Sequence, residues 1–152
     1  MKPEHNPIFS LVGRVLIASL FIPAGFTKLF GFAGVVNYVA AAGLPQPQLA
    51  AVIAIGVEIP LGIALLLGWQ TRKVAGILAA FTFIATMFFH QFWAVPEAQK
   101  MVQHLMFWKN MAIVGGLMMM ASLGGGAWSL DNWRAARRAG LSPAAEIGRA
   151  HV

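Results

Sequence analysis

The sequence predicts an all-α protein whose four helices cross a membrane as a bundle. Of its 152 residues, 59% are hydrophobic and only 11% are charged, and the mean hydropathy is +0.71. Soluble domains carry about 25% charged residues, so this chain lacks the polar surface that a soluble protein of its length needs. Four apolar stretches are each long enough to cross the hydrocarbon core of a bilayer.

The first predicted span covers residues 8–30, with Arg14 and Lys28 near its two ends. Residues 33–42 follow and favour a short helix at the membrane interface. A glycine and two prolines within residues 43–47 end this helix and form the turn into the second span.

The other three spans are separated by short polar segments. They are predicted over residues 48–69, 74–94 and 104–123, with a tight basic turn at 70–73 and a polar loop at 95–103. Residues 1–130 thus form a membrane domain, and residues 131–152 form a basic tail.

The distribution of basic residues predicts how the bundle is oriented. An even number of spans puts both chain ends on one side, together with seven basic residues: Lys2, Arg72, Lys73, Arg134, Arg137, Arg138 and Arg149. The opposite side has only Lys28 and Lys100, so the positive-inside rule predicts that both termini are cytoplasmic. Topology control and anionic lipid headgroups explain the net charge of +6 better than nucleic acid does. We therefore expect a multi-pass protein of the bacterial inner membrane.

Glu58 is the most informative residue, because it lies near the middle of the second span. A carboxylate at that depth costs roughly 2.5–3.5 kcal/mol, so it is expected to face the bundle interior and to have a partner. Lys109 is the most deeply placed cation of the fourth span, and we predict that Lys109 or Arg14 pairs with Glu58. An ion pair of this kind either serves transport or redox chemistry or simply fixes helix packing.

Polar side chains from several helices gather in the outer half of the predicted bundle. Thr82, Thr86 and His90 follow i, i+4, i+8 spacing and form one stripe on the third span. Lys109 and Asn110 lie on the fourth span, and the cluster also includes Lys28 and His104. Each member has a structural alternative, since Lys28 can extend to the interface and the threonines can bond their own helix.

The cofactor is left unidentified by the sequence. There is no cysteine, which excludes thiolate zinc sites and iron–sulfur clusters held by the chain's own thiolates, and no metal site is predicted. His90 and His104 are close to the surface, whereas a haem between them needs a deep slot, so haem is disfavoured. A redox role therefore requires a quinone, another bound cofactor or a partner subunit.

Several short motifs follow one another along the chain and together resemble the DoxX family. They are R-x-L at Arg14–Leu16, G-F-x-K-L-F at Gly25–Phe30, G-L-P-x-P at Gly43–Pro47, E-x-x-x-G at Glu58–Gly62, G-W-Q-T-R at Gly68–Arg72, His90, K-N at Lys109–Asn110 and G-x-W-S-L-D at Gly126–Asp131. The resemblance implies a four-helix bacterial inner-membrane protein. Some family members are associated with oxidoreductase systems, including thiosulfate:quinone oxidoreductase and a complex involved in thiol and superoxide stress.

Three functions stay open at this point. The first is a membrane subunit of a redox or oxidative and sulfur-stress system, in which Lys109, Asn110 or His90 hydrogen-bonds a quinone and Glu58 relays a proton. The second is a small proton-coupled permease that uses Glu58. The third is a non-catalytic anchor or assembly factor. Whether the chain is an enzyme is left open, as are a protein partner in a redox complex and a homodimer.

Overall fold

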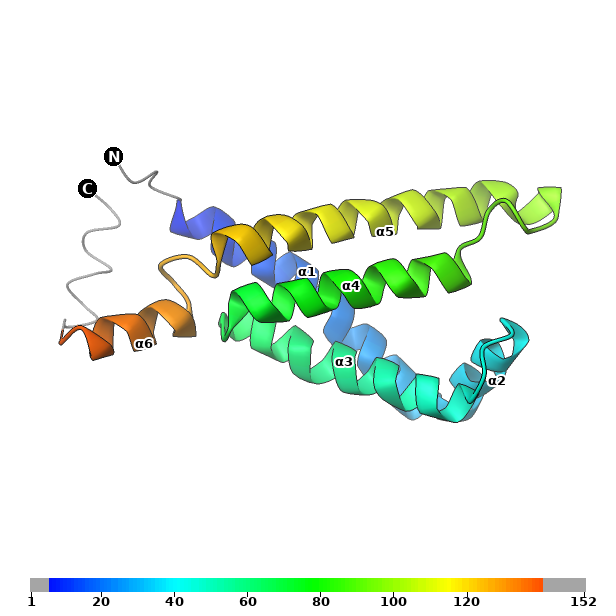
Figure 1. Cartoon of the computed structure of the whole chain (residues 1–152), viewed down its shortest axis with the longest axis horizontal. Coiled ribbons are helices and arrows are strands. Elements are labelled where there is room, and N and C mark those ends of the chain that lie inside the picture. The colour runs from blue at the N-terminus through cyan, green and yellow to red at the C-terminus, as the bar shows by residue number, and fades with distance from the viewer. Residues whose placement is uncertain (1–5, 141–152) are drawn as a thin grey trace.

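The computed structural model describes residues 6–140, and all regular structure in that range is helical. The helices are α1 (Pro7–Phe30), α2 (Phe32–Ala41), α3 (Pro47–Leu67), α4 (Thr71–Phe89), α5 (Glu97–Leu123) and α6 (Leu130–Arg138). Among them, α1, α3, α4 and α5 are long and apolar enough to cross a membrane. The predicted four-span all-α class is confirmed, and so is a short apolar helix between the first two spans (Figure 1).

The ends of α4 and α5 differ from the predicted spans. α4 begins at Thr71 and ends at Phe89, ahead of the predicted range 74–94. α5 begins at Glu97, so the prediction of a loop at 95–103 was wrong for most of that segment. The polar residues there extend α5 to 27 residues, or roughly 40 Å, which exceeds the roughly 30 Å hydrocarbon core. Hydropathy alone does not detect such a polar extension.

Two helix pairs build the bundle: α1 packs along α3, and α4 packs along α5. Glycines allow the close approach of α1 and α3. A Cβ at Gly25 of α1 would lie 2.5 Å from Ile59 Cγ1, and one at Gly62 of α3 would lie 2.9 Å from Ile22 Cγ1. Small residues at facing positions are a common way for membrane helices to pack closely.

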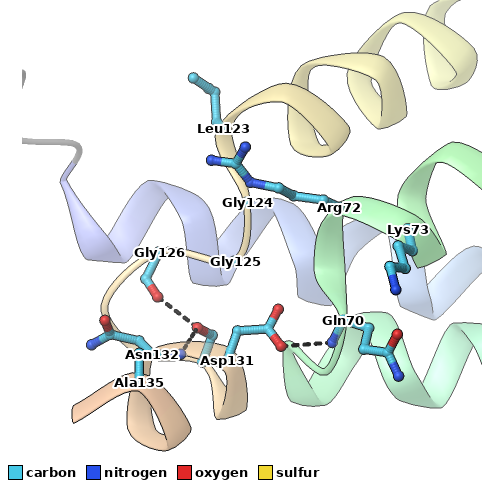
Figure 2. A pocket seen from close by; sticks show the side chains of 11 residues that line it. Gln70, Arg72, Lys73, Leu123, Gly124, Gly125, Gly126, Asp131, Asn132 and Ala135 are labelled. Atoms are coloured by element: carbon cyan, nitrogen blue, oxygen red, sulfur yellow. Dashed lines mark hydrogen bonds between the residues drawn. The ribbon is translucent and has the colours of Figure 1, made fainter. Parts of the chain in front are cut away.

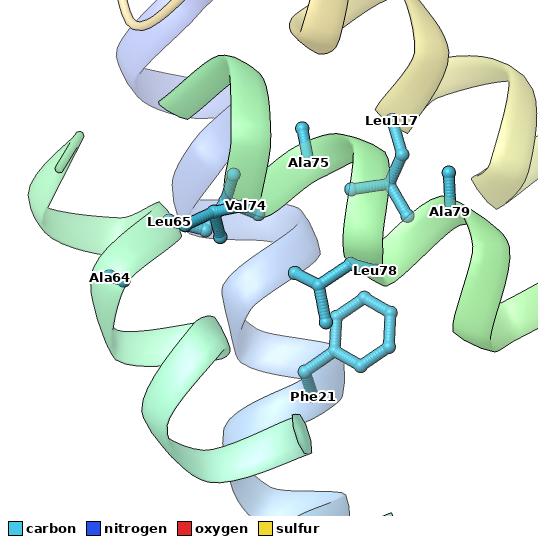
Figure 3. Close-up of a cluster of buried hydrophobic side chains, with 8 residues drawn as sticks. All are labelled: Phe21, Ala64, Leu65, Val74, Ala75, Leu78, Ala79 and Leu117. Carbon is cyan, nitrogen blue, oxygen red and sulfur yellow. The ribbon is translucent and has the colours of Figure 1, made fainter. Parts of the chain in front are cut away.

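The buried apolar core joins the two pairs near the α3–α4 turn. It comprises Phe21 of α1, Ala64 and Leu65 of α3, Val74, Ala75, Leu78 and Ala79 of α4, and Leu117 of α5 (Figure 3). Beyond this core α3 and α4 diverge, as Figure 1 shows. The bundle is therefore closed at one end and splayed at the other.

The closed end carries both ends of the described chain, and we call it the basic end because Arg14, Arg72, Lys73 and the arginines of α6 lie there. Arg14 is only 1% exposed; it donates hydrogen bonds to the carbonyl oxygens of Leu66, at 2.7 Å, and of Trp128. These bonds tie α1 to the end of α3 and to the segment before α6.

α6 covers the first part of the predicted basic tail. The Ser129 hydroxyl caps it by accepting from the N–H of Asn132, and Arg137 and Arg138 lie in its last turn, where cations favour the helix dipole. Residues 141–152 of the predicted tail, which include Arg149, lie outside the described residues. The cytoplasmic location of the basic end stays a prediction.

Candidate functional site

A cavity of ≈ 580 Å³ lies between the two helix pairs on the splayed side of the core. Most of its wall is apolar, with side chains such as Phe21, Val39, Ile53, Phe81 and Phe88. Its polar lining residues come from five helices and the segment after α4: Lys28, Tyr38, Glu58, Thr82, His90, Lys109 and Asn110. Five of the seven predicted site residues are thus brought to one cavity.

Glu58 is buried at 6% exposure, and it is paired with Lys28. Lys28 Nζ donates to both carboxylate oxygens, at 2.9 Å to Oε1 and 2.8 Å to Oε2. The expectation of a buried and paired carboxylate is therefore confirmed, whereas the predicted partners, Lys109 and Arg14, were wrong. Lys28, whose side chain is 30% exposed, does more than extend to the interface.

The close contact of α1 with α3 explains this choice of partner. The Cβ of Glu58 lies 3.2 Å from where a Cβ of Gly25 would be, so α1 passes directly over Glu58. Lys28 follows Gly25 by three residues and shares its helix face. Arg14 lies roughly 21 Å from Lys28 along the same helix. Its guanidinium is bound at the basic end.

Lys109 lies near the midpoint of α5 and lines the cavity without a carboxylate partner among the described residues. Its Nζ donates to Met106 Sδ at 3.2 Å, and a thioether is a weak acceptor. The ammonium group therefore has donors available for a ligand.

Asn110 is held by a chain of hydrogen bonds that leads into α4. Its Nδ2 donates to Thr86 Oγ1 at 3.0 Å, and that hydroxyl donates to the Thr82 carbonyl at 2.7 Å. Thr82 Oγ1 in turn donates to the Leu78 carbonyl, so the expectation that both threonines bond their own helix is confirmed. An amide has two N–H donors, and Asn110 keeps one for the cavity.

His90 and Tyr38 line the cavity near its splayed side. His90 Nδ1 lies 2.9 Å from Gln103 Oε1; because an amide oxygen only accepts, Nδ1 is the donor and Nε2 stays available. Tyr38 stacks on Phe89 with ring centroids 5.3 Å apart. Tyr38 is not among the predicted site residues, although it is the only tyrosine in the chain and falls on the predicted short helix.

Three other candidate residues do not line the cavity. Thr86 is completely buried behind Asn110, and Arg14 is at the basic end. His104 lies outside the cavity, where its Nε2 accepts from Trp108 Nε1 at 3.0 Å and its ring meets Phe92 edge-on. Of the two histidines of the predicted polar cluster, His90 therefore lines the cavity and His104 does not.

Comparison with known proteins gives consistent matches. The family model of DoxX matches residues 9–91, which include Lys28, Tyr38, Glu58 and His90. Inner membrane protein YphA of Escherichia coli K12 is 37% identical over 83% of this chain and 90% of its own length. Inner membrane protein YqjF of the same organism is 40% identical over 80% of this chain and 88% of its own. No solved structure matches.

Proposed function

Because this chain belongs to the DoxX family and is a multi-pass inner-membrane protein, we propose that it is a membrane subunit of a redox or stress-response system. In this proposal a quinone binds in the cavity beside Lys28 and Glu58. The observation that carries the proposal is the combination of an apolar cavity with polar groups on opposite walls.

The size and lining of the cavity suit a quinone. Small-molecule sites commonly enclose about 300–1,000 Å³ and are lined mainly by apolar and aromatic groups with a few polar ones. The cavity of ≈ 580 Å³ falls in that range, and its aromatic wall includes Phe81, Phe88 and Phe89. The planar conjugated ring of a quinone and its isoprenoid chain can pack against such a wall.

Three side chains supply the hydrogen-bond donors that the carbonyl oxygens of a quinone require. Lys109 Nζ has no carboxylate partner among the described residues, and Asn110 has a spare amide N–H. Lys28 directs two of its three N–H bonds at Glu58 and keeps the third. Lys109 and Asn110 come from α5 and Lys28 from α1, so the donors flank the cavity on both helix pairs.

The Lys28–Glu58 pair offers a place to hold a proton within the apolar region. A bound quinone supplies two-electron chemistry that consumes or releases two protons. Lys28 Nζ lies 2.8 Å from Glu58 Oε2, and across a hydrogen bond of this length a proton can pass between the two groups. The pair can thereby exchange protons with a group bound in the cavity without a free charge remaining in the membrane.

A titration with short-chain ubiquinone and menaquinone analogues tests this function. The full chain in nanodiscs should bind one of them saturably, which quenching of tryptophan fluorescence measures. The substitutions Lys109→Met and Asn110→Leu should weaken binding. Lys100→Gln is a matched control, because Lys100 also lies on α5 but pairs with Glu97 outside the cavity. Absence of saturable binding of either analogue to the wild-type chain rules out the proposal.

A further inference from the structure

A second cavity, of ≈ 520 Å³, lies at the basic end among the start of α4, the end of α5 and α6. Its wall includes Arg72 and Lys73 from α4, Leu123 at the end of α5, the glycine loop of residues 124–126 after it, and Asn132 and Ala135 from α6 (Figure 2). It is separate from the cavity beside Lys28 and Glu58, and the buried core lies between the two cavities.

The cavity presents positive charge. Arg72 and Lys73 are both exposed, and neither forms an ion pair within residues 6–140. The carboxylate of Asp131 also lines the cavity, but three donors bind it: the N–H of Gln70 at 2.7 Å, the N–H of Thr71 at 2.7 Å and the Thr71 hydroxyl at 2.9 Å. Figure 2 shows the Asp131 side chain directed toward Gln70. Two cations thus remain for a ligand.

The glycine loop, residues 124–126, lines the same cavity. Ser10 Oγ donates to the Gly125 carbonyl at 2.8 Å, which fixes the loop against α1. No acceptor for the N–H groups of Gly125 and Gly126 occurs in the part of the chain that the structure describes. The Arg72 side chain extends over this loop, since its Nε lies 3.3 Å from where a Cβ of Gly124 would be. Successive backbone N–H groups without partners are a common feature of anion sites, and here a guanidinium lies beside them.

We propose that this cavity binds a phosphate group. A guanidinium presents a fork of N–H donors that matches phosphate oxygens, and an ammonium adds a point charge. The phosphate belongs either to an anionic phospholipid or to a soluble compound. The surroundings favour a phospholipid, because the exposed rings of Trp69 and Trp133 lie at this end of the spans and tryptophan prefers the headgroup level.

Thermal unfolding of the full chain in dodecyl maltoside tests the proposal. Added phosphatidylglycerol should raise the Tm in a saturable way, and phosphatidylcholine should raise it less. In the double variant Arg72→Gln/Lys73→Gln the half-saturating concentration should rise roughly 20- to 30-fold, about fivefold for each basic residue lost. The control Arg134→Gln/Arg138→Gln removes two charges from the same end outside the cavity lining and should change it far less.

The proposal is overturned if the cavity variant responds like wild type, if both double variants lose the response equally, or if the two lipids act alike. Inorganic phosphate distinguishes the sources: stabilisation by phosphate alone indicates a soluble ligand, whereas stabilisation only by phosphatidylglycerol indicates the lipid. Should the double variant fail to fold, Lys73→Gln alone provides the test, with an expected weakening of about fivefold.

Discussion

Lys28 of α1 donates to both carboxylate oxygens of Glu58 on α3, at 2.9 and 2.8 Å, inside the apolar part of a membrane bundle. This contact joins two helices that already pack closely at Gly25. It also sets the polarity of one wall of the larger cavity. The pair can therefore affect both the stability of the bundle and the binding of a ligand, and separate experiments measure the two effects.

Loss of the Glu58 charge should destabilise the bundle. Glu58→Gln leaves the Lys28 ammonium without its counter-ion, and we expect the free energy of unfolding to fall by about 2 kcal/mol. This is less than the roughly 3–5 kcal/mol of a fully buried pair, because the Lys28 side chain is 30% exposed. Unfolding in detergent, followed by circular dichroism, measures the change.

Two controls accompany that experiment. Glu97→Gln breaks the exposed pair with Lys100 and should cost less than about 1 kcal/mol. The double variant Lys28→Met/Glu58→Met removes both charges together and should be more stable than Glu58→Gln. Equal stability of Glu58→Gln and Glu97→Gln would contradict a structural role for the buried pair.

A side chain at Gly25 should force α1 and α3 apart. In Gly25→Ala the new methyl group would lie 2.5 Å from Ile59 Cγ1 and 3.2 Å from the Ile59 backbone nitrogen, so we expect a loss of about 1–3 kcal/mol. Gly56→Ala on α3 is the control, since nothing lies within 4 Å of its Cβ position. Its stability should be unchanged or slightly higher. Equal stability of the two variants would show that the helices do not meet at Gly25.

Asp131 should hold α6 to the start of α4. Asp131→Ala removes the acceptor for the N–H groups of Gln70 and Thr71, and a lost helix cap costs about 1–2 kcal/mol. Hydrogen exchange by mass spectrometry should show faster exchange in peptides that contain these two amides, while peptides from the core of α3 stay protected. Unchanged exchange near residue 71 would rule out this capping role.

The basic end should face the cytoplasm. A fluorescent protein fused after the last residue is expected to fluoresce in cells, whereas alkaline phosphatase at the same position should be inactive, since it requires the oxidising outer side. The reverse pattern would invert the topology and put the cavity that Arg72 and Lys73 line on the periplasmic face.

The four spans and the burial of Glu58 could be predicted because hydropathy along one helix depends only on the local sequence. The partner of Glu58 could not, since it depends on which faces of two helices meet. The predicted depth in the membrane favoured Lys109 as the partner, whereas the close approach of α1 and α3 at Gly25 selects Lys28. The cap that Asp131 provides for α4 joins residues sixty positions apart, which no local pattern indicates.

In the candidate site, too, some residues could be predicted from the sequence and others could not. Glu58, His90, Lys109 and Asn110 are polar residues in apolar stretches, a signal that sequence alone provides. Tyr38 carries no such signal, because a tyrosine in a short helix is ordinary. It joins the cavity only through the packing of α2 near the end of α4, where its ring stacks on Phe89.

Photo-crosslinking with an azidoquinone tests the central proposal most directly. The full chain in nanodiscs is irradiated with the probe, and labelled peptides are identified by mass spectrometry. We expect labels on cavity residues of α4 and α5, such as Phe88 and Asn110, that disappear when excess unlabelled quinone competes. Labelling that is confined to outward-facing side chains, or that competitor does not reduce, would contradict a quinone site beside Lys28 and Glu58.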